Sequence, residues 1–173
     1  MIEKIPFVPL KDIAEITQGI NLKSSLAKSL SKRKQEEQYG LKENDVAIRR
    51  DIYAKGKKIA AVIKHSSEKL IPGTSSLIIR PDISIVNPVY LKAFLEFIPS
   101  DKALKELNIS NQKKLLSKGS LSKLKIPLPP LQEQINMTSN YEKVQTVELY
   151  DRYRNPIIEQ YNSLKKFFWS YYN

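Results

Sequence analysis

The residues best suited to chemistry in this chain are cations gathered at one predicted hairpin end. Arg49 and Arg50 end a predicted strand, and three lysines surround the turn that follows: Lys55, Lys57 and Lys58. An arginine forked onto guanine is worth ~1–3 kcal/mol of discrimination against a wrong base, whereas a lysine on a phosphate adds affinity that salt removes. Strand alternation sends Arg49 and Arg50 to opposite faces, so one could read a base edge while the other holds a phosphate.

A second cluster, later in the chain, mixes amides with cations: Asn111, Gln112, Lys113, Lys114 and Lys118. Amide side chains can fork onto adenine, and lysines suit the nucleic-acid backbone. The two clusters together predict nucleic-acid binding. The first candidates for contact with DNA are their cations: Arg49, Arg50, Lys55, Lys57, Lys58, Lys113, Lys114 and Lys118.

The distribution of charge favours the same function. The 173 residues include 29 basic and 18 acidic ones, for a formal net charge of +11. Residues 1–131 hold 24 basic and 13 acidic residues, which is the whole of the excess, whereas residues 132–173 hold five of each. A basic part beside a neutral tail suggests polyanion binding in the first and protein contact in the second. Lysines that merely solvate a surface are the alternative, but solubility would not require such segregation.

Motifs for catalysis are weak. With no cysteine and only His65, thiolate chemistry and any site with two imidazoles are excluded. Asn87-Pro88-Val89-Tyr90 resembles the Asn-Pro-Pro-Tyr motif of amino-methyltransferases, but the second proline is absent and a helix cap is the better interpretation. Asp45 and Asp51 lie beside basic residues and suit turns or salt bridges. We therefore predict no enzyme activity, no catalytic residue, no metal site and no cofactor.

The elements that must position these residues are strands first and helices last. The polar stretch 22–39 is predicted to be a loop with about one helical turn, and Gln18-Gly19 gives a turn signal. Short alternating or apolar runs predict strands, which lie at 7–10, 13–17, 45–50, 57–64 and 75–80. Strands of this length and spacing indicate an α+β fold with a small twisted antiparallel or mixed sheet.

Two helices and a stiff connector should follow the sheet. Asn87 is the expected cap of a helix that starts at Pro88 and stops by Pro99, and Ser100 is expected to cap a second helix over 101–107. Prolines at 127, 129 and 130 then favour an extended segment. We expect this connector to separate a recognition domain, residues 1–131, from a helical region, residues 132–173.

The tail is predicted to be a long helix that needs a partner. From Val147 onward, apolar residues recur at alternating steps of four and three, which is a coiled-coil seam. Some forty helical residues would span about 60 Å, too long for a small domain to cover. Pro156 should either kink this helix or start a second one. The expected contact residues for a dimer or partner are Ile157, Tyr161, Leu164 and Phe168. The alternative is that the helix folds back on its own domain.

A family resemblance adds to these inferences. Residues 115–134, LLSKGSLSKLKIPLPPLQEQ, closely resemble the end of a target-recognition domain in the specificity subunit of type I restriction-modification systems. Residues 9–20, PLKDIAEITQGI, look like the opening of that domain, and the segments between are similar in order and spacing. The chain departs from the family at Asp51, where many relatives have glycine.

The resemblance implies a reader of DNA that does no chemistry itself. Specificity subunits of this family carry two recognition domains, separated by long helices, and bind a bipartite DNA site. This chain holds one such domain, which implies either a half-subunit that forms a homodimer through its tail or a fragment of a longer protein. The implied partners are double-stranded DNA and a DNA adenine methyltransferase subunit, with a translocating restriction subunit as a further one. The amino terminus shows no export signal and no segment reaches the ~18 apolar residues of a membrane span, so we expect a cytoplasmic protein without membrane contact.

Two other functions are compatible with the same residues. The first is a non-specific RNA- or DNA-binding adaptor with a helical arm for docking proteins. The second is a small nuclease whose carboxylates are not grouped in the sequence. Duplex selection separates the first from a specificity domain, and a magnesium-dependent cleavage assay tests the second.

Overall fold

A four-stranded antiparallel sheet forms the centre of the molecule. The structure is a computed structural model that describes residues 5–51, 60–65, 70–96, 115–142, 159–160 and 162–170. The strands are β2 (Ala14–Gln18), β3 (Val46–Arg49), β4 (Ala60–Val62) and β5 (Ser76–Pro81), in the order β2-β5-β3-β4. All three pairings are antiparallel. The α+β class and the small antiparallel sheet are therefore confirmed, and each strand overlaps a predicted one.

A second, two-stranded sheet ties the beginning of the chain to the proline connector. β1 (Phe7–Pro9) pairs antiparallel with β6 (Lys125–Pro127), and Val8 lies opposite Ile126. The 3-10 turn η1 (Leu10–Asp12) follows β1, and the short helix α5 (Lys118–Lys123) precedes β6. Ile126 is fully buried. The connector is extended, as its prolines predict, but it is packed into the fold rather than exposed as a linker.

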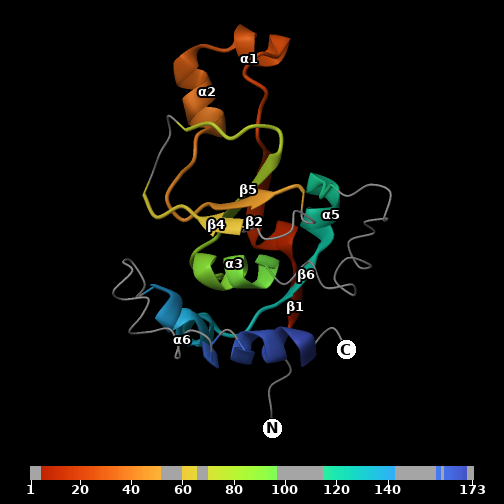
Figure 1. The fold of residues 1–173 in the computed structure, drawn as a ribbon, viewed down its shortest axis with the longest axis vertical. Coiled ribbons are helices and arrows are strands. Elements are labelled where there is room, and N and C mark those ends of the chain that lie inside the picture. The colour runs from red at the N-terminus through yellow and green to blue at the C-terminus, as the bar shows by residue number, and fades with distance from the viewer. Residues whose placement is uncertain are drawn as a thin grey trace.

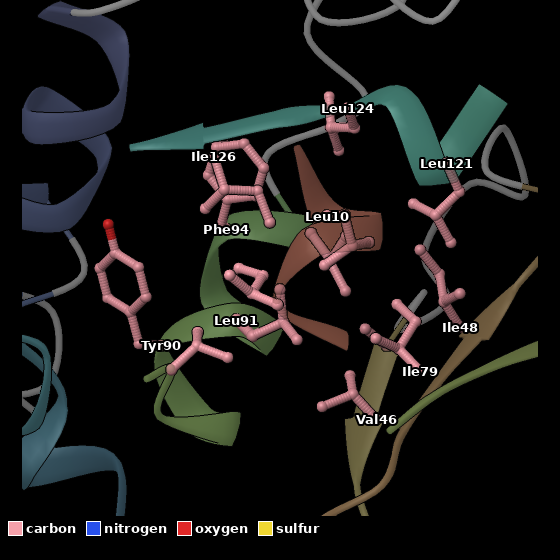
Figure 2. Packing of buried hydrophobic residues seen from close by; sticks show 14 of the residues in the cluster. Leu10, Val46, Ile48, Ile79, Tyr90, Leu91, Phe94, Leu121, Leu124 and Ile126 are labelled. Atoms are coloured by element: carbon pink, nitrogen blue, oxygen red, sulfur yellow. The ribbon is translucent and has the colours of Figure 1, made fainter. Parts of the chain in front are cut away.

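Helix α3 (Pro88–Glu96) packs against the sheet and closes the core. The cap is the predicted one, because the Asn87 side-chain oxygen accepts hydrogen bonds from the amides of Val89 and Tyr90 at 2.9 and 3.0 Å. Figure 2 shows Leu91 of this helix on the side of the sheet residues Val46 and Ile79, and Phe94 beside Ile126. Leu10, Leu121, Leu124 and Ile126 close the space between them.

The stretch predicted to be a loop forms two helices instead. They are α1 (Ser25–Ser29) and α2 (Lys32–Tyr39). We call these two helices and the preceding residues, Asn21–Ser24, the helical lobe. Each helix begins after a serine that caps it. The Ser24 hydroxyl accepts a hydrogen bond from the Ala27 amide, and the Ser31 hydroxyl accepts one from the Lys34 amide. The prediction was wrong because it weighed the weak apolar spacing and overlooked these serine caps.

The tail folds back on the rest of the chain. Helix α6 (Leu131–Glu142) follows the connector, and residues 162–170 form a further helical segment beside α3. Leu164 and Phe168 are 3% and 1% exposed. The ring of Phe168 lies 5.5 Å from that of Tyr90 and 5.1 Å from that of Phe94, measured between centroids. Within the described residues, the alternative in which the helix covers its own domain is the observed one.

This packing corrects the interface assigned to Leu164 and Phe168. Both side chains are covered by their own chain, because the short helix α3 leaves an apolar face that they fill. Ile157, Tyr161 and Pro156 lie outside the described residues, as do Pro99, Ser100 and the predicted helix over 101–107. The described parts of the tail, 131–142, 159–160 and 162–170, show no long uninterrupted coiled coil, and the boundary at residue 131 stays a prediction. The described helices include none long and apolar enough to cross a membrane.

Candidate nucleic-acid interface

The described members of the two predicted cationic clusters, Arg49, Arg50 and Lys118, lie at one end of the sheet. Asp51, just after β3, forms an antiparallel bridge with Leu115, just before α5. The Leu116 amide donates a hydrogen bond of 2.7 Å to the Arg50 carbonyl. Arg49 and Arg50 of the first cluster are thus brought to the same place as Lys118 of the second, across 66 positions of sequence between Arg50 and Leu116. The other candidate cations, Lys55, Lys57, Lys58, Lys113 and Lys114, lie outside the described residues.

Arg50 is the side chain that holds this junction together. Its Nε donates to the Leu116 carbonyl at 2.9 Å, and its Nη1 donates to the Thr74 carbonyl at 3.3 Å. Its own amide donates to the Ser75 carbonyl at 2.9 Å. Arg50 therefore links β3, the turn before β5 and the start of α5. A structural role was not predicted for this residue, and its part in DNA contact stays a prediction.

Arg49 and Lys118 are the described cations at the junction that are left available. Arg49 is half-buried at the end of β3, opposite Ser76 of β5, and forms no ion pair with the part of the chain that the structure describes. Gln18 of β2 and Ile48 of β3 both pair with Leu77 of β5, so Gln18 lies at the same end of the sheet as Arg49. Lys118 is exposed at the first position of α5. This end of the sheet, defined here by Gln18, Arg49 and Lys118, is the candidate interface.

A close backbone approach shapes the rim of the interface. The Gly19 amide donates to the Ser76 carbonyl at 3.1 Å, and the next amide, that of Ile20, donates to the Pro72 carbonyl at 3.0 Å. A Cβ atom on Gly19 would lie 2.1 Å from the Gly73 oxygen and 2.4 Å from the Pro72 oxygen. Only glycine fits there without moving the turn, which explains the glycine after Gln18.

The opposite end of the sheet carries an ion pair between Asp45 and Arg80. Asp45 is fully buried and accepts two hydrogen bonds of 2.8 Å from Arg80 and one of 2.8 Å from the Lys42 amide. The hydrogen bond from Arg80 to Asp45 raises the pKa of the Arg80 guanidinium further above its usual value, against the effect of partial burial. The predicted salt-bridge role of Asp45 is confirmed. The charges of Asp45 and Arg80 thus neutralise each other.

A buried glutamine in the connector motif was missed by sequence reasoning. The Gln134 oxygen accepts from the Asn87 amide at 2.8 Å, and its nitrogen donates to the carbonyls of Ile85 and Pro129 at 3.1 and 2.8 Å. Gln134 therefore joins the start of α3 to the start of α6. Its place at the end of the motif that carries the family resemblance was the signal that could have identified it.

The described residues show no sign of a metal or imidazole site. His65 is exposed at the end of the β4 region. Over the described ranges, no three histidine, cysteine, aspartate or glutamate side chains group in a way that could hold a metal ion.

The fold is that of type I restriction-modification specificity subunits. The HsdS subunit from Thermoanaerobacter tengcongensis matches with a TM-score of 0.53 and 17% identity, over 96% of this chain and 43% of that one. A type I restriction-modification S subunit from M. genitalium matches with a TM-score of 0.51 and 16% identity, over 98% and 45%. A chain from a structure on complex assembly and conformational transition of the type I R-M system matches with a TM-score of 0.53 and 17% identity, over 96% and 44%.

This likeness concerns the fold and part of each neighbour. The chain spans less than half the length of the solved structures that it matches. No protein-family model and no curated protein sequence matches it.

Proposed function

We propose that this chain is a non-catalytic DNA sequence-recognition subunit of a type I restriction-modification system. It binds one half-site of a bipartite duplex through the candidate interface at Gln18, Arg49 and Lys118. The observation that carries the proposal is the Asp51–Leu115 bridge, which brings the ends of both cationic clusters together on a fold shared with known specificity subunits. A polyanion fits such a site because its phosphates neutralise the gathered cations.

The test of this proposal is duplex selection from a randomised pool. The purified chain should enrich one short motif, with or without a candidate methyltransferase partner. Enrichment of no motif, with equal affinity for all duplexes, would favour the non-specific adaptor instead. Magnesium-dependent cleavage by the chain alone would contradict a non-catalytic role.

The first expected outcome concerns Arg49. Arg49→Ala should weaken binding to the selected half-site by about 1–3 kcal/mol more than binding to random duplex if the guanidinium reads a base. Equal losses on both duplexes, measured by titration at one salt concentration, would reassign Arg49 to phosphate contact. Arg50→Ala is no clean control because it also removes the links to Leu116 and Thr74. Lys64→Ala, an exposed change just after β4 at the other end of the sheet, is the better one.

Assembly belongs to the neutral, helical part in this proposal. Residues 132–173 dock the adenine methyltransferase subunit and pair two copies of the chain, and a restriction subunit joins the complex they form. Since Leu164 and Phe168 face inward, such contacts use the outer side of the helices, where Lys165, Lys166 and Trp169 are exposed. Light scattering of the chain with and without the methyltransferase tests this assembly.

A further inference from the structure

The helical lobe contributes almost no buried surface to the fold, so packing does not explain why the chain forms it. Ala27 is its only fully covered residue, and α2 buries no residue at all. None of its side chains belongs to the hydrophobic core described above. Leu22 and Leu26 are 50% and 59% exposed. A segment that contributes so little to the core but keeps a defined shape is a candidate for binding.

The lobe keeps its shape through polar contacts of its own. The serine caps start each helix, and the Gln35 side chain donates to the carbonyls of Ala27 and Leu30, at the end of α1. The Ser29 hydroxyl donates to the Leu26 carbonyl at 2.7 Å. These bonds hold α1 and α2 in one relative arrangement, so the charges on them are presented in a set geometry.

The charges of the lobe are mostly positive. Five cations are exposed, and they are Lys23, Lys28, Lys32, Arg33 and Lys34. Only Arg33 has an ion pair among the described residues, with Glu37. The first three positions of α2 are all cationic, although the positive end of the helix dipole favours acidic residues there. This arrangement opposes folding locally, and a nearby polyanion would relieve it.

The position of the lobe fits a second contact with the same ligand. It starts shortly after Gln18, which belongs to the candidate interface, and it ends before β3, which leads to Arg49. In Figure 1 it lies at one end of the long axis, and α6 with the C-terminal helical segment lies at the other. The exposed cations of the lobe are therefore remote from the neutral assembly region.

From these observations we infer that the helical lobe is a separate, sequence-independent binding surface for the sugar-phosphate backbone of duplex DNA. The inference rests on the proposed function and adds a second surface to it. Duplex DNA is the occupant because unpaired lysines on a preformed scaffold match closely spaced phosphates, which displace counterions when they are bound. The contacts reach DNA that flanks the half-site, so they add affinity and carry no sequence information.

The test is the salt dependence of binding by the full chain. The variant carries Lys32→Gln, Arg33→Gln and Lys34→Gln, and its control carries Lys11→Gln and Lys64→Gln, which are exposed cations outside the lobe, the candidate interface and the assembly region. The probe is a labelled random-sequence duplex of about three helical turns, roughly 30 base pairs. Binding is followed by fluorescence anisotropy between about 50 and 200 mM salt.

The lobe variant should show a salt slope shallower by about 2–3 and roughly tenfold weaker binding at low salt. Its preference for a selected motif over random duplex should stay unchanged, and the control should match the wild type in every respect. Because α2 buries nothing, the variant should fold, with an unchanged helical circular dichroism signal. An unchanged slope in the lobe variant overturns this inference and leaves the proposed function intact. A wild-type chain that binds no duplex overturns both. Normal DNA binding with loss of the methyltransferase subunit would assign the lobe to protein docking and also overturn it.

Discussion

Arginines of this chain have different roles that depend on their neighbours. Arg80 pairs with the fully buried Asp45, Arg50 joins main-chain carbonyls, and Arg33 forms an exposed pair with Glu37 in which its side chain is 88% accessible. Burial decides how much each ion pair contributes to stability. Water screens an exposed pair, whereas a buried charge that loses its partner has no water to replace it.

Two arginine substitutions should separate these cases. Arg80→Ala leaves the Asp45 carboxylate buried without its ionic partner, and we expect a loss of about 3–5 kcal/mol in the free energy of unfolding. Arg33→Ala removes a pair on the surface and should cost less than about 0.5 kcal/mol. Urea denaturation of both variants measures the difference. Equal effects would show that the Asp45–Arg80 pair is not the anchor of this sheet end.

The roles of single residues were predictable only where they depend on near neighbours. The Asn87 cap and the salt-bridge role of Asp45 follow from the adjoining sequence and are confirmed. The structural role of Arg50 could not be predicted, because its partner Leu116 lies 66 positions away and only the folded sheet brings them together.

At the scale of elements, the junction of α3, β6 and α6 depends on two polar side chains. The Tyr90 hydroxyl donates to the Pro127 carbonyl at 2.7 Å, and Gln134 satisfies the ends of both helices. Prolines cannot donate hydrogen bonds, so the connector relies on such side chains to hold it in place.

Gln134→Ala should therefore destabilise the protein by about 2–4 kcal/mol, because it removes the partner of the Asn87 amide and of two carbonyls at a partly or fully buried place. The control is Gln132→Ala in the same helix turn, where the exposed amide contacts only Asn136 and the expected cost is within about 0.5 kcal/mol. Thermal unfolding compares the two. A mild effect of Gln134→Ala would mean that water replaces the lost bonds.

Strands were predicted better than the lobe for a physical reason. Alternation of apolar residues reports the burial that stabilises a strand, and β3 shows this alternation, whereas β5 is an apolar run buried on both faces. The lobe has little burial to report, and its helices depend on the caps at Ser24 and Ser31. Hydrophobic periodicity therefore fails there, although the caps are visible in the sequence.

On the scale of the whole molecule, one core crosses the predicted boundary at residue 131. Phe168 of the tail packs on Tyr90 and Phe94 of α3. The seam spacing that predicted a partner interface is present, since Leu164 and Phe168 lie on one face, but the chain itself occupies the other side. Periodicity shows that a face must be covered and cannot show by what.

Phe168→Ala distinguishes the two situations. We expect a loss of about 3–5 kcal/mol in unfolding free energy, independent of protein concentration, because the cavity forms within one chain. Trp169→Ala, at a neighbouring position that is 47% exposed, should cost less than half as much. A loss that grows as the protein is diluted would instead place Phe168 at a contact between copies.

The Gln134 junction also restricts how this chain can change its length over evolution. Each residue inserted between Pro129 and Gln134 would turn the glutamine side chain by about 100° around α6 and carry it away from the Asn87 amide and the Ile85 carbonyl. The helical tail can therefore become longer or shorter only through changes further along α6, where the hydrogen bonds of Gln134 are kept.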